Sequence, residues 1–160
     1  MIKWIARLLS RVLISIRPIS KQDLWVEIDE FATMPAIGIL FGGDRLTCCD
    51  EVLAAYAGST FLGVVTLSSE GETLSGEPAI VGLWVHYDHR GEGVGSVLLT
   101  AAVKRMAKRG LVPVSIIPLS SKVLGMLEKL PPNLRKQVKV EGGFTAETPL
   151  SGFADQALDL

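Results

Sequence analysis

The stretch Arg90–Ser96, which reads RGEGVGS, decides the fold because it joins a run of apolar residues to a long amphipathic segment. Its three glycines allow successive backbone N–H groups to turn toward one ligand and approach it closely. The first turn of a following helix adds unpaired N–H donors and the positive end of the helix dipole. This stretch therefore predicts a binding site for a phosphate or a pyrophosphate.

The spacing of these glycines excludes two common nucleotide-binding motifs. In the dinucleotide motif Gly-x-Gly-x-x-Gly, the third glycine falls on Ser96 when counted from Gly91, and on Leu98 when counted from Gly93. The phosphate loop Gly-x-x-x-x-Gly-Lys-Ser/Thr requires a Gly-Lys pair, which occurs nowhere in the chain. An enzyme that binds a nucleotide at this stretch is therefore disfavoured.

The segments on either side of the stretch predict a strand and a helix. Ala79–His86 is apolar at nearly every position, as expected of a central strand covered on both faces. Val94–Arg109 has helical periodicity, and Gly110 ends that helix. The residues expected to face inward are Val94, Val97, Leu98, Ala101, Ala102 and Met106, and those expected to face outward are Lys104, Arg105 and Lys108.

Upstream, the clearest local signal is a hairpin. Glu51–Ala57 and Thr60–Leu67 are rich in apolar and β-branched residues, and Gly58-Ser59 between them fits a type II′ turn. Near the N-terminus, Leu13–Arg17 predicts a short strand, which Pro18 ends by removing a backbone donor.

Ser20 predicts the start of a helix over about Lys21–Phe31 with one apolar face. The residues expected on that face are Leu24, Trp25, Ile28 and Phe31. Ala32–Asp50 predicts an irregular connection around a short apolar run at Ile37–Phe41.

Downstream, Leu111–Ile117 predicts a strand. Ser120 or Ser121 predicts the cap of a helix that continues through Leu130. Val138–Val140 predicts a last strand.

The composition fits one domain. The chain has 160 residues, of which 48% are hydrophobic and 21% charged, enough for a single core. We assign residues 13–141 to this domain, with an N-terminal helical extension at 1–12 and a C-terminal tail at 142–160. The 16 basic and 17 acidic residues give a net charge of -1, which disfavours nucleic acid as the main ligand.

Cysteine and histidine are too scarce to build a metal centre. Cys48 and Cys49 are adjacent and are the only cysteines, and His86 and His89 are the only histidines, so no metal is expected. The cysteines also give no disulfide framework, which indicates a reducing compartment, and we expect the cytoplasm.

Residues 1–12 predict an amphipathic basic helix, because Trp4, Ile5, Leu8, Leu9 and Val12 recur at helical spacing. Arginines interrupt the apolar run, so neither a membrane span nor a secretion signal is expected. We expect the helix to pack on its own domain or on a second subunit, which favours a homodimer. The alternative is contact with an anionic membrane surface.

The glycine stretch resembles the acyl-CoA signature Arg/Gln-x-x-Gly-x-Gly/Ala of the GCN5-related N-acetyltransferase (GNAT) family, with matches at Arg90, Gly93 and Gly95. The order of strand, helix, strand and helix around it is similar too, so the resemblance covers about Leu13 to Leu130. One departure is Tyr87, which stands where a proline is frequent in the family.

The resemblance implies a single-domain α/β (α+β) fold, with a mixed, mostly antiparallel sheet flanked by helices and with splayed central strands. It implies acetyl-CoA as the acyl donor, its pyrophosphate on backbone N–H groups from Gly91 to Ser96 and its pantetheine beside the strand. A backbone N–H near Val85 would polarise the thioester carbonyl. The cofactor-binding residues implied in this way are Trp84, Val85, Arg90, Gly91, Glu92, Gly93, Val94, Gly95 and Ser96.

The family's usual proton-transfer groups are missing. In the register of the resemblance, Leu127 falls at a frequent tyrosine, Ser120 at an asparagine and Ser115 at a carboxylate. The catalytic candidates that we substitute are His86, because imidazole titrates near neutral pH, and Ser120, which could order a water or donate weakly. Both residues have a non-catalytic interpretation, as a cleft-lining side chain and a helix cap.

These observations predict an acyltransferase that moves an acetyl group from acetyl-CoA to a primary amine of a small molecule or a peptide. The missing acid and base keep a second hypothesis open, a catalytically degenerate acyl-CoA-binding module with a regulatory or assembly role. The sequence does not identify the acceptor.

Overall fold

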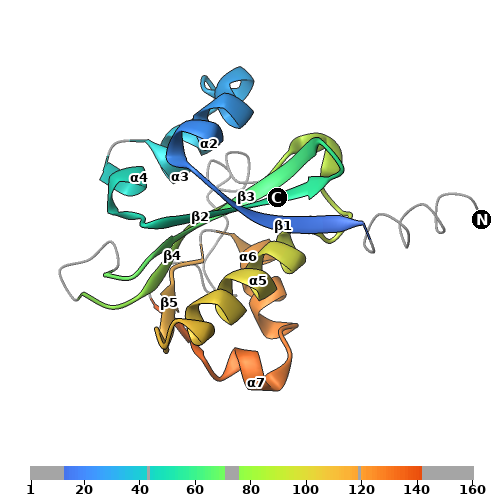
Figure 1. Ribbon diagram of the computed structural model, residues 1–160. Helices are drawn as coiled ribbons and strands as arrows, with labels where there is room; N and C mark the ends of the chain where they lie inside the picture. The colour runs from blue at the N-terminus through green and yellow to red at the C-terminus, as the bar shows by residue number, and fades with distance from the viewer. Residues whose placement is uncertain (1–12, 43, 71–75, 119, 142–160) are drawn as a thin grey trace, which may run out of the picture.

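The computed structural model describes residues 13–42, 44–70, 76–118 and 120–141, and in that part of the chain six strands form one sheet in sequence order (Figure 1). The strands are β1 (Ile14–Ile19), β2 (Glu51–Ala57), β3 (Thr60–Ser68), β4 (Ala79–Val85), β5 (Val114–Ile116) and β6 (Val138–Val140). Pairing is antiparallel from β1 to β4 and parallel from β4 to β6. The predicted mixed α/β fold is confirmed.

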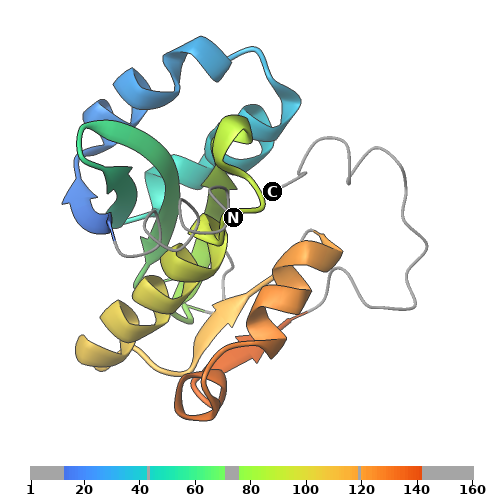
Figure 2. The same cartoon turned by 90° about the vertical axis from the view of Figure 1, so that its right-hand side faces the viewer.

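Helices cover both faces of the sheet (Figures 1 and 2). One layer holds α2 (Lys21–Ile28), the 3-10 turn η1 (Asp29–Phe31), α3 (Pro35–Phe41) and α4 (Asp44–Cys48), and the other holds α5 (Val94–Lys108), α6 (Ser121–Glu128) and α7 (Pro132–Arg135). Each layer has its own apolar core against the sheet. None of the helices in the described ranges is long and apolar enough to cross a membrane.

Local sequence signals set several element boundaries. The Ser20 hydroxyl accepts a hydrogen bond from the Asp23 backbone N–H at 2.9 Å and caps α2. In the β2–β3 turn, Gly58 has φ +62 and no non-glycine residue in the described chain has positive φ, as in the predicted type II′ turn. At the end of α5, Gly110 has φ +73, and the N–H of Leu111 reaches the carbonyl of Met106 at 2.9 Å, the bond of a Schellman cap.

Two predictions near the N-terminus are wrong. Pro18 does not end β1, which continues to Ile19, because β1 is an edge strand and pairs only with β2. Trp25 was predicted to lie on the apolar face of its helix, but it is 41% exposed, whereas Leu24 and Ile28 are buried. The buried face of α2 is therefore narrower than predicted.

Two further predictions differ from the structure, one for the connection before β2 and one for the buried face of α5. Ala32–Asp50 contains α3 and α4 rather than an irregular connection, because the apolar side chains of α3 pack on β4. On α5, Val97 and Ala101 are partly exposed, whereas Leu99 and Val103 are buried in their place. The predicted helix at 1–12 and tail at 142–160 lie outside the described residues.

The two central parallel strands separate soon after they meet. β4 and β5 pair only at Ala79 with Ser115 and at Ile80 with Ile116. Beyond Ile80, β4 continues for five residues along β3 alone. The predicted splay is therefore present, and one edge of β4 has no strand neighbour in the described chain.

A buried glycine allows β3 and β4 to lie close together. A Cβ atom on Gly63 would lie 2.6 Å from the carbonyl oxygen of Trp84 and 3.1 Å from a methyl group of Leu98. The first neighbour is backbone and cannot move without separating the two strands. At Gly38 in α3, by contrast, a Cβ would meet nothing within 4 Å.

Alanine at these two glycines should therefore have opposite effects on stability. We expect Gly63→Ala to lower the free energy of unfolding by about 1–3 kcal/mol, as overpacking does. Gly38→Ala should raise it by about 0.5–1 kcal/mol, because alanine favours helix. Urea unfolding of both variants measures the difference, and equal effects would contradict the close packing.

Charged residues join the start of β2 to the last turn of α5. Arg105 donates to Glu51 at 2.7 Å, and Arg109 donates to Glu51 at 3.0 Å and to Asp50 at 3.4 Å. Burial alone would raise the pKa of Asp50, but hydrogen bonds from Ser69 and Arg109 outweigh it and hold that pKa below its ordinary value.

Because its pKa is lowered in the folded state, Asp50 stabilises the fold at pH values above its unfolded-state pKa, about 3.9. That contribution is lost as the pH falls through the lower folded-state pKa. Asp50→Asn removes the charge, so the variant should be less stable than the wild type near neutral pH, and the difference should shrink as the pH falls below the unfolded-state pKa of about 3.9. Urea unfolding of both proteins across this pH range measures the difference in their free energies of unfolding. A difference that does not change with pH would contradict the lowered pKa of Asp50.

Candidate functional site

The turn between β4 and α5 has the backbone that the glycine stretch predicted. After β4 comes the 3-10 turn η2 (Tyr87–His89), and then Gly91 with φ +75 and Gly93 with φ +86, values that side-chain-bearing residues rarely adopt. Gly93 is the N-cap of α5. The first N–H groups of a helix have no acceptor within it, so this turn presents backbone donors where an anion would bind.

Gly95 fixes the place of the turn against the rest of the fold. A Cβ atom there would lie 2.9 Å from the sulfur of Met126 on α6 and 3.6 Å from a methyl group of Val85. The first turn of α5 therefore lies against both the end of β4 and α6. Glu92, beside it, has its carboxylate 3.5 Å from Nδ1 of His89.

The free edge of β4 faces the gap left by β5. The His86 N–H bonds to the Leu62 carbonyl of β3 at 2.9 Å, so in the alternating antiparallel pattern Leu83 and Val85 point their N–H and C=O groups away from β3. The Val85 carbonyl accepts a hydrogen bond from Nε of Arg90 at 3.1 Å. Burial of Arg90 in this contact lowers its pKa from the ordinary value. The N–H groups of Leu83 and Val85 are placed to bind an extended ligand.

Trp84 projects to the other face of the sheet. Its side chain is fully buried in the core under α2, α3 and α4, with ring centroids 5.1 Å from Phe31 and 6.3 Å from Phe61. The structure thus gives the Trp84 ring a core position, while the neighbouring Val85 faces α5.

His86 lies in an aromatic cluster at the end of β4. Its ring stacks on Tyr87 at 4.7 Å and meets the edge of Phe31 at 4.9 Å. Nδ1 accepts a hydrogen bond from the Asp88 backbone N–H at 3.1 Å, and Nε2 is 4.0 Å from a carboxylate oxygen of Glu30. An imidazole that accepts at Nδ1 carries its proton on Nε2, so neither nitrogen offers a free lone pair in this arrangement.

Ser120 caps a helix on the opposite face. Its hydroxyl accepts a hydrogen bond from the Val123 N–H at 3.3 Å at the start of α6, and the residue is 2% exposed. Leu127, about two helix turns after Ser120, is fully buried in the α5-side core. His86 packs on the α2-side layer, so the structure places the two catalytic candidates on different faces of the sheet.

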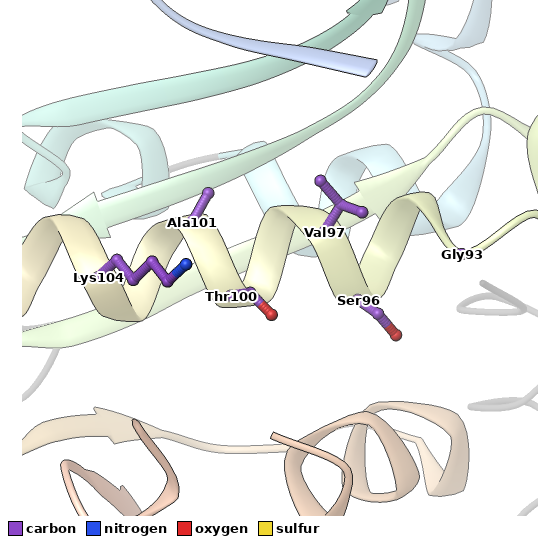
Figure 3. A pocket seen from close by; sticks show the side chains of 6 residues that line it. All are labelled: Gly93, Ser96, Val97, Thr100, Ala101 and Lys104. Atoms are coloured by element: carbon purple, nitrogen blue, oxygen red, sulfur yellow. The ribbon is translucent and has the colours of Figure 1, made fainter. Parts of the chain in front are cut away.

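The sequence did not predict the groove that runs along α5. It has a volume of about 460 Å³ and is lined by Gly93, Ser96, Val97, Thr100, Ala101 and Lys104. Figure 3 shows Ser96, Thr100 and Lys104 along one side, with Val97 and Ala101 pointing to the other. Gly93, Val97 and Ala101 recur every four residues in the sequence. Because Val97 and Ala101 were predicted to lie in the core, this spacing did not indicate a groove. Among the described residues, no group of three or more His, Cys, Asp or Glu side chains could hold a metal ion.

Comparison with known proteins points to one family. The model of the acetyltransferase (GNAT) family matches residues 16–126, which run from β1 into α6. No curated protein matches the chain.

Solved structures share the fold at low sequence identity. One is an aminoglycoside acetyltransferase from an uncultured soil metagenomic sample in complex with sisomicin, with TM-score 0.51, 16% identity and 86% and 99% of the two chains covered. Another is a transcriptional regulator from Bacillus halodurans C-125, with TM-score 0.52, 16% identity and coverage of 84% and 99%. An acetyltransferase of Bacillus subtilis in complex with CoA has TM-score 0.49, 18% identity and coverage of 72% of each chain.

The two histidines should have different neutral tautomers. His86 accepts at Nδ1 and should be protonated at Nε2, whereas Nδ1 of His89 faces the Glu92 carboxylate at 3.5 Å and should carry the proton. Long-range ¹H–¹⁵N NMR of the neutral rings distinguishes the tautomers. A proton on Nδ1 of His86 would show that its Nε2 is free to act as a base.

Proposed function

The chain belongs to the acetyltransferase (GNAT) family, and from this premise we propose that it transfers an acetyl group from acetyl-CoA to a primary amine. The observation that carries the proposal is the edge of β4 beyond Ile80, which has no strand neighbour in the described chain and is followed, after η2, by the glycine turn at the start of α5. An extended thioester and a pyrophosphate fit these two adjoining sets of backbone donors.

In this proposal, main-chain groups hold the cofactor. The N–H groups from Gly91 to Ser96 bind the pyrophosphate, and the Leu83–Val85 edge pairs with pantetheine as an added strand would. A backbone N–H of that edge polarises the thioester carbonyl and stabilises the oxyanion. Arg90 acts indirectly, because its hydrogen bond to Val85 holds the turn against the end of β4.

The reaction needs few side chains. An unprotonated amine attacks the thioester carbon, a C–N bond forms, the C–S bond breaks, and the thiolate takes a proton. Holding the two reactants in contact supplies up to about 7–11 kcal/mol of the barrier, whereas each positioned acid or base adds about 10²–10⁴ in rate. We propose that water carries the amine proton and that His86 and Tyr87 line the acceptor side.

One observation favours a second candidate, an acyl-CoA-binding module without catalysis. The polar atoms of His86 and Ser120 are held by local backbone hydrogen bonds, and Leu127 is buried. Such a module would bind the cofactor through the same main-chain groups but would not turn it over.

Under either candidate function we propose that the protein works in a reducing compartment such as the cytoplasm, which the free thiols of Cys48 and Cys49 support. The homodimer stays a prediction.

Calorimetric titration with acetyl-CoA, CoA and ATP tests the cofactor. We expect Gly93→Trp to weaken CoA binding by about 10- to 100-fold, the worth of one or two charge-assisted hydrogen bonds, because it blocks the turn and strains φ. Gly58→Trp is the matched control, since Gly58 also has positive φ but lies in the β2–β3 hairpin. Equal losses in both variants would mean that backbone strain alone is responsible.

Turnover separates the two candidates. Thiol release from acetyl-CoA in the presence of a panel of amines supports the transferase. Tight binding without release on any amine supports the binding module. ATP binding that CoA does not displace would overturn both.

A further inference from the structure

We propose that residues 1–12 dock as a helix on the outer face of α2 in the same molecule. The docking site, which we name the α2 surface, joins two exposed apolar side chains to three exposed carboxylates: Trp25, Val26, Asp23, Asp29 and Glu30. This inference does not depend on the proposed acetyl transfer, because none of the proposed cofactor-binding groups belongs to the α2 surface.

Two adjacent apolar side chains of α2 are exposed. Val26 is 76% exposed and Trp25 is 41% exposed, whereas Leu24 and Ile28 of the same helix are buried. At 3.6 residues per turn, Val26 lies opposite the buried stripe and Trp25 lies between the two. An apolar patch that polar residues surround is typical of an interaction site.

The polar residues around this patch are acidic. Asp23 and Asp29 stand three residues before and after Val26, and Glu30 stands four residues after it, at the spacings that make neighbours on a helix. Asp23 and Asp29 form no ion pair with another described residue, and a carboxylate oxygen of Glu30 lies 4.0 Å from Nε2 of His86. The α2 surface therefore favours a partner that combines apolar side chains with positive charge.

The sequence of residues 1–12 has this combination. It contains three basic residues, Lys3, Arg7 and Arg11, and no acidic residue. Its apolar residues recur at helical spacing and are Trp4, Ile5, Leu8, Leu9 and Val12. A helix over this segment would place its apolar stripe on Trp25 and Val26 and its bases near the carboxylates.

The start of β1 lies close to α2, so the segment is within reach of its docking site. Ser15 of β1 pairs with Tyr56 of β2, and the Tyr56 hydroxyl donates a hydrogen bond to a carboxylate oxygen of Glu27 on α2 at 3.2 Å. Leu13, where the described chain begins, is only two residues before Ser15 and is 64% exposed. A helix of 12 residues is about 18 Å long, and the eight residues of α2 span about 12 Å, so the segment can cover the whole of α2.

Amide hydrogen exchange of the full chain, read by mass spectrometry, tests the apolar contact. An isolated helix of 12 residues is marginal in water, so slow exchange in residues 1–12 reports docking. We expect these amides to exchange at least about tenfold more slowly than those of an unstructured chain, and Val26→Lys to remove about tenfold of that protection, the worth of one buried valine. Ile39→Lys is the matched control, since Ile39 is an exposed apolar residue of α3 outside the α2 surface, and it should keep the wild-type protection.

Charge reversal tests the electrostatic contact with the same readout. The double variant Arg7→Glu, Arg11→Glu should lose protection in residues 1–12, because its new carboxylates face those of the α2 surface. Adding Asp29→Lys and Glu30→Lys to that variant should restore the protection. Added salt should weaken the protection of the wild type.

Four results would overturn the inference. Exchange of residues 1–12 at unstructured rates in the wild type would show that the segment does not dock. Protection that Val26→Lys leaves unchanged, or that Ile39→Lys reduces equally, would place the segment elsewhere. Protection that increases with protein concentration would assign the α2 surface to a second copy of the chain. Protection that appears only with vesicles of an anionic phospholipid would assign the segment to a membrane surface.

Discussion

The separation of β5 from β4 after Ile80 is the constraint on which the site depends. Two strands that stayed paired would satisfy each other's backbone groups and leave no room for a ligand. Here, Leu83 and Val85 turn their polar backbone groups toward the gap, and Arg90 takes only the Val85 carbonyl. Both strands also contribute to the core under α5 and α6, β4 through Leu83 and Val85 and β5 through Val114 and Ile116.

The glycine turn matters because of where packing holds it. Gly95 lies against Met126 and Val85, and the Gly91 and Gly93 backbone turns the chain from the end of β4 into α5. The free edge of β4 and the N-terminus of α5 are therefore adjacent. The fold that holds this turn is shared with solved structures at 16% identity.

Side-chain chemistry is correspondingly sparse. His86 and Ser120 are engaged by neighbouring backbone N–H groups, on different faces of the sheet. Proximity and a polarised carbonyl would then carry most of the rate in the proposed reaction. Side chains with ring or groove contacts lie at the rims: the aromatic cluster of His86 and Tyr87 at the end of β4, and the groove along α5.

The sequence by itself determined the elements whose conformation depends on neighbours in the chain: the Gly58-Ser59 hairpin, the Ser20 cap, and α5 between Gly93 and Gly110. It also placed the glycine turn between β4 and α5, since positive φ at Gly91 and Gly93 is a local requirement. Only the tertiary structure decided which side chains are covered. It turned the Trp84 ring into the opposite core, left Val97 and Ala101 partly exposed, and formed α3 and α4 where periodicity was weak. The reason is physical: caps and turns are fixed by bonds within a few residues, whereas burial and the position of a free strand edge depend on segments far away in the chain.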